Sequence, residues 1–302
     1  MKNKEPLISI IINCFNGERY LNECLNSILT QSYKNYEVVF WDNQSTDKSK
    51  LIFLDINDNR FKYFSDNEHV TLYGARNKAL KVSTGKYITF LDVDDMWYPD
   101  KLEKQVNVME KNFKIGFCYS GFKFLSENSN KLKSAYNNKN LKSGYICSNL
   151  IRNYNVGILT LMVNKSIVIK NKITFDERFT IMGDLDFVLR LSKISLGIPI
   201  KLDLAIYRNH LENLSKKTTL TVKERNIWAN EMLSNSIFSK KELIPFIQET
   251  KYLDFLNHLK KDKLIKAFKK IITLQGIFLI KGIFIIFLRF KNFIIKVLKS
   301  IF

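Results

Sequence analysis

The first 112 residues alternate between two patterns of apolar and polar positions. Short, mostly apolar runs at residues 7–12, 36–41, 61–64 and 87–91 are typical of buried strands. Residues 18–30, 48–54 and 73–82 carry apolar side chains at helical spacing, and Pro99 suits the first turn of a fourth helix that runs to about residue 111. This alternation predicts an α/β fold, a Rossmann-like and mostly parallel sheet with helices on both faces.

The pattern after residue 113 is less regular. Residues 115–124 are predicted to form a strand pair or a strand and a turn, and the polar residues 126–143 a mobile loop. A strand at 158–163, helices at 165–170 and 184–193, and a last strand at 198–207 follow, and the chain is predicted to be helical from about residue 222. We therefore expect a catalytic domain over residues 1–218, with halves 1–112 and 113–218, and a helical, basic region over 219–302.

Polar clusters follow three of the predicted strands, at residues 13–16, 42–47 and 92–95. Ligands bind at the carboxyl ends of strands in open parallel sheets, so these clusters mark a candidate site. Asp92, Val93 and Asp94 form a D-x-D pattern. Two carboxylates this close repel each other, and Mg²⁺ or Mn²⁺ shared with substrate phosphates would relieve the repulsion. The simpler interpretation is an Asp-rich turn that caps the helix at Pro99.

Four segments then carry a resemblance to a known family. The runs LISIIINCFNGERYLNECLNSILTQSY, EVVFWDNQSTDKS, GARNKAL and GKYITFLDVDDMWYPDKLE, together spanning about residues 7–104, resemble the family 2 glycosyltransferases. A weaker match continues at residues 175–191 and 207–215. The resemblance implies the GT-A fold, Mg²⁺ or Mn²⁺ as cofactor, and transfer of a sugar from a nucleoside diphosphate with inversion at the anomeric carbon.

The resemblance also implies roles on the donor side of the site. Phe15 matches an aromatic residue that stacks on the nucleobase, and Asp42 an acid that accepts a hydrogen bond from it, which favours uridine. Arg76 matches an arginine near the diphosphate; without the family pattern it is equally a charge on a helix surface. Asp92 matches a contact to the ribose and the metal shell, and Asp94 the principal metal ligand.

On the acceptor side the resemblance implies a general base at the start of a helix. Asp184 is the matching residue, although Gly183 stands where the family has a glutamate. Asp184 would take the proton from the attacking hydroxyl; as an acid at a helix start it could equally be a cap, and Asp186 is the second candidate for the base. His210 is a candidate ligand of the metal or the phosphate, and a structural histidine is the alternative.

The chain has a formal net charge of +19, which bears mainly on the prediction for its C-terminal residues. Residues 263–302 hold no acid and are rich in Ile, Phe and Leu, and their basic residues are Lys263, Lys266, Lys269, Lys270, Lys281, Arg289, Lys291, Lys296 and Lys299. This composition favours an interfacial helix on an anionic membrane over a membrane span. A helical bundle packed on the catalytic domain is the simpler alternative.

Charge and cysteine content also bear on partners and compartment. The sequence has no groove-reading motif, so nucleic acid is not an expected partner. The start of the chain lacks the pattern of a secretory signal, and the four cysteines are expected to be buried free thiols. We therefore expect a cytoplasmic protein, peripheral on the inner face of the cell membrane.

The functional prediction is an inverting glycosyltransferase of surface polysaccharide synthesis. Its partners would be a nucleotide-sugar donor, preferably a UDP-sugar, a glycan or lipid-linked acceptor, and the membrane. A catalytically silent nucleotide-sugar-binding scaffold at the membrane is the alternative, because the glutamate before Asp184 is missing and residues 13–14 depart from the family pattern. A basic nucleic-acid-binding protein would leave the acidic strand ends unexplained.

Overall fold

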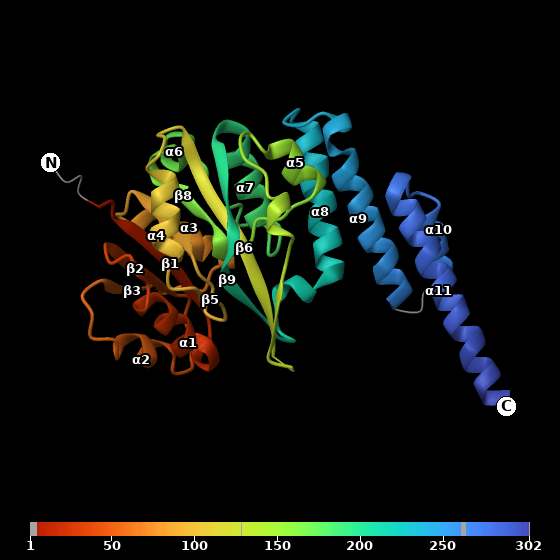
Figure 1. Cartoon of the computed structure of the whole chain (residues 1–302), viewed down its shortest axis with the longest axis horizontal. Coiled ribbons are helices and arrows are strands. Elements are labelled where there is room, and N and C mark those ends of the chain that lie inside the picture. Colours follow the sequence, from red (N-terminus) through yellow and green to blue (C-terminus); the bar gives the residue numbers. More distant parts are fainter. Residues whose placement is uncertain (1–4, 128, 261–263, 302) are drawn as a thin grey trace. The chain divides into compact units, whose positions relative to one another are not determined.

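The computed structural model describes residues 5–127, 129–260 and 264–301. These residues form two compact units, of which the first ends at Asn213 and the second begins at Leu214. The first unit holds the whole β-sheet, and the second contains only helices (Figure 1). Each unit is considered by itself.

The first half of the sheet is parallel, as the sequence predicts. Its strand order is β3-β2-β1-β4, and the register places Cys14, Asp42 and Ser65 side by side at the ends of β1, β2 and β3. The elements in chain order are β1 (Ile8–Cys14), α1 (Glu18–Leu29), β2 (Tyr36–Asp42), α2 (Ser49–Leu54), β3 (Phe61–Ser65), α3 (Leu72–Val82) and β4 (Tyr87–Phe90). The polar loops that follow these strands therefore share one edge of the sheet.

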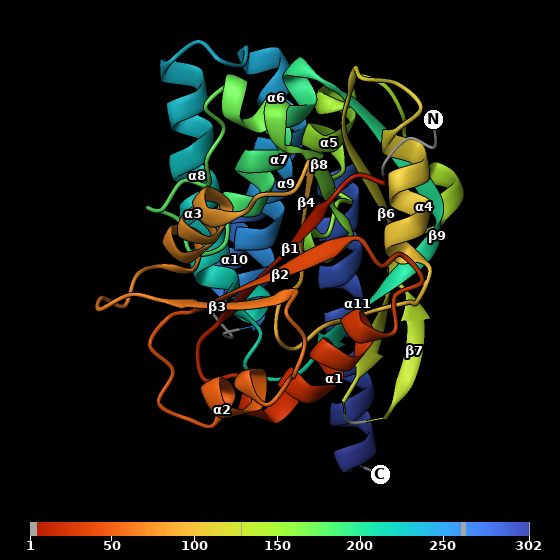
Figure 2. The same cartoon turned by 90° about the vertical axis from the view of Figure 1, so that its left-hand side faces the viewer.

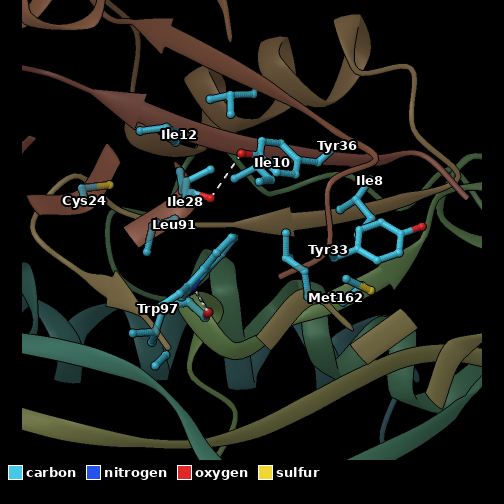
Figure 3. Packing of buried hydrophobic residues seen from close by; sticks show 14 of the residues in the cluster. Ile8, Ile10, Ile12, Cys24, Ile28, Tyr33, Tyr36, Leu91, Trp97 and Met162 are labelled. Carbon is cyan, nitrogen blue, oxygen red and sulfur yellow. Dashed lines mark hydrogen bonds between the residues drawn. The ribbon is translucent and has the colours of Figure 1, made fainter. Parts of the chain in front are cut away.

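Helices cover both faces of this half, because β1, β2 and β4 are buried on both sides. Ile8, Ile10 and Ile12 of β1 pack with α1 and α2 in the main hydrophobic core, whereas α3 lies on the opposite face (Figure 2). Figure 3 shows this core continuing to Trp97, whose indole Nε1 donates a hydrogen bond of 2.8 Å to the carbonyl oxygen of Leu159. The core thus joins the two halves of the unit.

The second half extends the sheet with antiparallel pairs. The full order is β3-β2-β1-β4-β8-β6-β9-β5, with β7 paired to β6; β8 is antiparallel to β4 and β6, whereas β6 and β9 are parallel. Its elements are β5 (Met96–Trp97), α4 (Lys101–Met109), β6 (Ile115–Ser126), β7 (Lys131–Ser134), α5 (Cys147–Arg152), β8 (Met162–Asn164), α6 (Lys165–Lys170), α7 (Gly183–Ile194) and β9 (Leu196–Asn209). The α/β fold class is confirmed.

Several local predictions in this half were wrong. Residues 115–124 belong to one long strand, and the predicted loop at 126–143 contains β7 and a 3₁₀ turn, Asn138–Asn140. β7 is polar because it is an exposed edge strand with no face turned to the core. Residues 158–163 divide into a 3₁₀ turn, Ile158–Thr160, and β8, and α5 escaped prediction because it is a short helix of six residues.

The second unit is helical, as predicted. Its helices are α8 (Thr218–Ser234), α9 (Lys240–Lys260), α10 (Leu264–Ile271) and α11 (Gly276–Ile301), after a 3₁₀ turn at Leu214–Lys216. Phe255 and Leu259 of α9 pack with Ala267, Ile271 and Leu274. None of the helices in the described ranges is long and apolar enough to cross a membrane.

The four cysteines are buried and free, as expected from their apolar surroundings. Burial raises the pKa of the thiols of Cys14, Cys24 and Cys118. They are therefore protonated, unreactive packing residues at neutral pH.

Candidate functional site

The loops after β1 and β2 are tied together by side chains. Asn16 adopts a left-handed conformation with φ of 52°. Its side-chain oxygen accepts a hydrogen bond of 2.8 Å from the backbone N–H of Thr46, and its own N–H donates to Ser45 Oγ at 2.9 Å. Asparagine tolerates this backbone conformation better than most residues. The two loops therefore form one ordered rim at the carboxyl edge of the sheet.

Two aromatic side chains, Phe15 and His69, lie at this rim. Phe15 is 53% exposed, and its ring lies edge to face with the ring of His69, with 4.5 Å between the centroids. The His69 Nδ1 lies 2.8 Å from the carbonyl oxygen of Asn43. Because a carbonyl can only accept, Nδ1 carries the proton and Nε2 of the neutral ring is an acceptor. Sequence reasoning missed His69, which has no motif of its own.

Asp42 is the last residue of β2 and is only 3% exposed. One carboxylate oxygen accepts the backbone N–H of Ser45 at 2.9 Å, and the other accepts the hydroxyl of Tyr63 at 2.6 Å. Both oxygens thus already take part in holding the loop. The predicted contact of Asp42 with a nucleobase stays a prediction.

Arg76 is the charged centre of the site. It is 1% exposed, so the alternative interpretation as a surface charge on the helix is wrong. One guanidinium nitrogen lies 2.6 Å from the Asp92 carboxylate, and another forms an ion pair with Asp184. A cation that is buried between two carboxylates fixes both of them. The predicted contact of Arg76 with a diphosphate stays a prediction.

Packing on one face of the sheet explains why these residues meet. Phe90 of β4 contacts Phe187 of α7, with 6.2 Å between the ring centroids. Side chains alternate along a strand, so Asp92 points to the same side as Phe90. α3 lies on that side too, and it carries Arg76. The end of β4, the middle of α3 and the start of α7 therefore converge.

Asp184 has a perturbed acidity. Burial raises the pKa of its carboxyl group to about 6; Arg76 opposes this shift and Asp92 adds to it. A carboxylate with such a pKa is ionised near neutral pH and basic enough to accept a proton. The second candidate, Asp186, is 4% exposed, and its Oδ2 accepts from Arg190 Nε at 2.9 Å. Its carboxylate is thus engaged on its own helix.

A steric constraint explains why the residue before Asp184 is a glycine. A Cβ atom at Gly183 would lie 2.5–2.6 Å from ring atoms of Tyr73, which is too close for any side chain. Tyr73 is held there by its hydroxyl, which donates to the carbonyl oxygen of Ile181 at 3.0 Å. The missing glutamate therefore reflects a tyrosine that occupies its space.

Asp94 meets His210 at the other end of the site. The His210 Nε2 lies 2.9 Å from Asp94 Oδ2, and Asn213 Nδ2 lies 3.4 Å from the same oxygen. Burial and then the charge of Asp92 raise the pKa of Asp94, whereas the hydrogen bond from His210 lowers it. The structure thus brings together the predicted ligands Asp94 and His210, which are 116 residues apart.

Arg208 and Asp95 hold this arrangement. Asp95 is 1% exposed and accepts the backbone N–H of Arg208 at 3.0 Å. The Arg208 side chain donates to the carbonyl oxygen of Asp94 at 3.1 Å and to Glu23 at 2.7 Å. Asp95 therefore anchors the end of β9 to the D-x-D loop, which places His210 beside Asp94. Sequence reasoning did not single out Arg208.

The donor set of this region fits a divalent cation that is shared with substrate. His210 Nε2 faces Asp94 Oδ2, so a cation that replaced the proton between them could be held by both, while the buried Nδ1 has no hydrogen-bond partner among the described residues. Within the described ranges no three His, Cys, Asp or Glu side chains form a metal cage. Mg²⁺ is commonly held by one or two carboxylates together with substrate phosphates, so Asp92 and Asp94 need no such cage.

Comparisons with known proteins show the family to which the chain belongs. Residues 9–166, just over half of the chain, match the model of glycosyl transferase family 2, and the chain belongs to that family. One relative is the Escherichia coli UDP-Glc:α-D-GlcNAc-diphosphoundecaprenol β-1,3-glucosyltransferase WfgD, 33% identical over 162 residues. The match covers 54% of this chain and 62% of that relative's length.

Two solved structures share the fold. Staphylococcus aureus TarS 1–349 in complex with UDP-GlcNAc has a TM-score of 0.64 and 18% identity, over 80% of this chain and 71% of that one. The mannosyltransferase PcManGT of Pyrobaculum calidifontis, in complex with GDP-Man and Mn²⁺, has a TM-score of 0.60 and 14% identity, over 91% and 77%. The GT-A fold predicted from the sequence is confirmed.

Proposed function

We propose that the protein is an inverting glycosyltransferase that transfers a sugar from a UDP-sugar to a lipid-linked glycan acceptor, as in surface polysaccharide synthesis. The observation that carries the proposal is the position of Arg76, whose guanidinium joins Asp92 on the donor side to Asp184 on the acceptor side. A metal-binding carboxylate and a general base thereby share one edge of the sheet. The uridine preference rests on the family resemblance of Asp42.

The donor side would bind the nucleotide. The exposed face of Phe15 offers a stacking surface for a base, and the acceptor Nε2 of His69 suits a ring N–H such as that of uracil. Asp92 and Asp94 would hold Mg²⁺ or Mn²⁺, and His210 would join them through Nε2 where the cation takes the place of the proton between Nε2 and Asp94. When bound, the cation supplies positive charge to the leaving diphosphate. Asp95 and Arg208 keep the Asp94 backbone in place.

The acceptor side would activate the attacking hydroxyl. Asp184 accepts its proton, and a pKa of about 6 leaves this carboxylate ionised at neutral pH. Arg76 holds the carboxylate in one orientation through their ion pair. A single displacement of this kind inverts the anomeric carbon and needs no covalent intermediate on the protein.

The C-terminal unit would attach the protein to an anionic membrane surface. Exposed apolar side chains occur in α10, in α11 and in the turn between them: Ile265, Phe268, Ile272, Ile277, Ile280, Ile283, Phe284 and Phe287. Lys266, Lys269, Lys270 and Lys281 lie in the same helices. Apolar side chains among lysines suit an interfacial helix, and a lipid-linked acceptor would be found at that surface. The site would then work at the cytoplasmic face.

Vesicle flotation tests the attachment. Replacing Ile277, Ile280 and Phe284 together by Ser should leave the protein in the unbound fraction with vesicles of one-third phosphatidylglycerol, while the intact chain floats. Replacing the exposed Leu51 and Leu54 of the first unit by Ser is the matched control. Flotation of both variants would contradict membrane attachment through these helices.

Donor hydrolysis and transfer test the activity. We expect the protein to cleave UDP-glucose or UDP-GlcNAc slowly with Mn²⁺, to lose this activity in a chelator, and to transfer sugar to an undecaprenol-diphosphate-linked GlcNAc. Binding of UDP without any turnover would instead support the alternative, a silent nucleotide-sugar-binding scaffold.

A further inference from the structure

The first unit contains an open cavity lined by residues other than those of the candidate site. Its volume is about 560 Å³, and its lining includes Tyr98 and Asp100 from the segment between β5 and α4, Lys123 of β6, and Leu202 and Asp203 of β9. Small-molecule sites in proteins commonly have volumes of about 300–1,000 Å³. The cavity is therefore large enough to hold a small ligand.

The cavity lies along the strands that also hold the D-x-D loop. The backbone N–H of Tyr98 donates to the carbonyl oxygen of Leu204 at 3.1 Å, and β5 continues this pairing along Ala205 and Ile206. Arg208, which contacts the D-x-D loop, follows Leu204 on the same strand after about 13 Å of extended chain. The cavity is thus a neighbour of the candidate site and separate from it.

Two side chains of the lining carry hydrogen-bond donors that the protein leaves unused. Lys123 Nζ lies 5.7 Å from the centroid of the Tyr98 ring, and no carboxylate of the described ranges lies within ion-pair distance of it. In the same part of the chain the Tyr98 hydroxyl has no hydrogen-bond partner. Both residues are half-buried, so solvent reaches them. Both groups are therefore available to a ligand.

Two carboxylates of the lining supply acceptors in fixed positions. Asp203 Oδ1 accepts a hydrogen bond of 2.9 Å from Asn138 Nδ2, and Asp203 Oδ2 accepts one of 2.5 Å from the Ser134 hydroxyl. Asp100 Oδ2 accepts a hydrogen bond of 2.5 Å from Lys104 Nζ. A carboxylate offers about four lone-pair positions, so both still have capacity for the hydroxyl of a ligand.

This combination of groups favours a carbohydrate over other small ligands. An anion such as phosphate would be repelled by Asp100 and Asp203, and a bare cation would be repelled by Lys123. A purely apolar molecule would leave these polar groups without hydrogen bonds. A pyranose ring has hydroxyls that both donate and accept, and it has C–H faces that can pack on Tyr98 and Leu202.

We propose that this cavity binds a neutral sugar unit of a glycan, as a second carbohydrate site of the protein. Asp100 and Asp203 accept hydrogen bonds from the sugar hydroxyls, and Lys123 and the Tyr98 hydroxyl donate to them. The assignment goes beyond the proposed function, because it concerns binding alone and uses no group of the catalytic site. In a protein that extends glycans, such a site would retain the chain beside the place where it is lengthened.

Removing the two unused donors tests the assignment on the full chain. Tyr98→Phe together with Lys123→Ala deletes both groups and breaks no side-chain hydrogen bond among the described residues. Saturation-transfer NMR would use cellobiose and N,N′-diacetylchitobiose as probes, without any nucleotide. We expect the wild-type protein to bind at least one of them at millimolar concentration. The Kd should rise about tenfold in the double variant, as loss of two hydrogen bonds predicts.

Tyr145→Phe together with Lys133→Ala is the matched control, because it makes the same chemical changes at exposed residues outside the cavity. We expect the control to keep the wild-type Kd. Equal Kd values in the two double variants would overturn the assignment, as would binding of neither disaccharide by the wild-type protein. Inorganic phosphate that binds more tightly than either disaccharide, and only when Tyr98 and Lys123 are intact, would also overturn it.

The outcome is separable from that of the proposed function, because the binding measurement contains no nucleotide. Sugar binding by a protein that cleaves no donor would refute only the proposed function. Donor cleavage by a protein that binds neither disaccharide would refute only the assignment of this cavity.

Discussion

The donor side and the acceptor side of the site are built in different ways. On the donor side Phe15, Asp92 and Asp94 follow parallel strands, and the register of the sheet alone brings their loops together. On the acceptor side Asp184 starts α7, and this helix is positioned by its packing on α5 and β6. Strand order positions the first set, and side-chain packing positions the second.

This difference separates binding from turnover. Under the proposed function, the donor side should bind a nucleotide even when the acceptor side is altered, because Arg76 is the side chain that forms ion pairs with both Asp92 and Asp184. Changes on the acceptor side should therefore lower kcat with little effect on UDP binding. Changes on the donor side should affect both.

The largest effect is expected for Asp184→Asn. The amide keeps the shape of the side chain and a hydrogen bond to Arg76 but cannot take a proton, so turnover should fall by about 10³-fold. UDP affinity, measured by calorimetry, should be unchanged. Asp186→Asn is the paired control; a larger loss in that variant would transfer the role of the base to Asp186.

The next effect is expected for Asp94→Ala. Turnover should fall by about 10²–10³-fold, because charge at the leaving diphosphate would be less well stabilised. UDP binding should no longer depend on Mn²⁺, which distinguishes this variant from Asp184→Asn. Asp55→Ala, which changes an exposed carboxylate outside the site, controls for net charge. Full metal dependence in Asp94→Ala would refute the metal assignment.

The direction in which hydrolysis depends on pH follows from the pKa of Asp184. A general base works in its ionised form, and burial raises the pKa of Asp184 to about 6. Hydrolysis measured as kcat/KM should therefore rise about tenfold per unit of pH below 6 and level off above it. A profile that stays flat down to pH 4.5 would exclude a group with this pKa as the base.

The smallest effect is expected for Phe15→Ala. Aromatic pairs contribute about 0.5–1.5 kcal/mol, so the Kd for UDP should rise about threefold to tenfold, with kcat nearly unchanged. Phe113→Ala is a suitable control, because Phe113 is 85% exposed and lies outside the site. Equal Kd values for UDP in both variants would contradict stacking of the nucleobase on Phe15.

The sequence predicts the donor side better than the acceptor side for a physical reason. A buried strand followed by a polar loop is a local pattern, so residues 13–16, 42–47 and 92–95 could be placed at one edge from periodicity alone. The family resemblance added Arg76, Asp184 and His210. The free cysteines and the helical C-terminus also followed from local composition.

Other features depend on contacts between distant residues. No local pattern shows that Arg76 is buried between two carboxylates, that Tyr73 fills the space beside Gly183, or that Arg208 ties β9 to the D-x-D loop. β7 looks like a loop because an exposed edge strand carries polar residues on both faces.

The central claim is that the donor side is a metal-assisted nucleotide site. Calorimetric titration of UDP and of GDP, each with and without Mn²⁺, tests it most directly. The account predicts that UDP binds, that Mn²⁺ tightens this binding, and that GDP binds less well. Metal-dependent binding of GDP alone would contradict the uridine preference assigned to Asp42. Binding of neither nucleotide, with or without Mn²⁺, would contradict the claim itself.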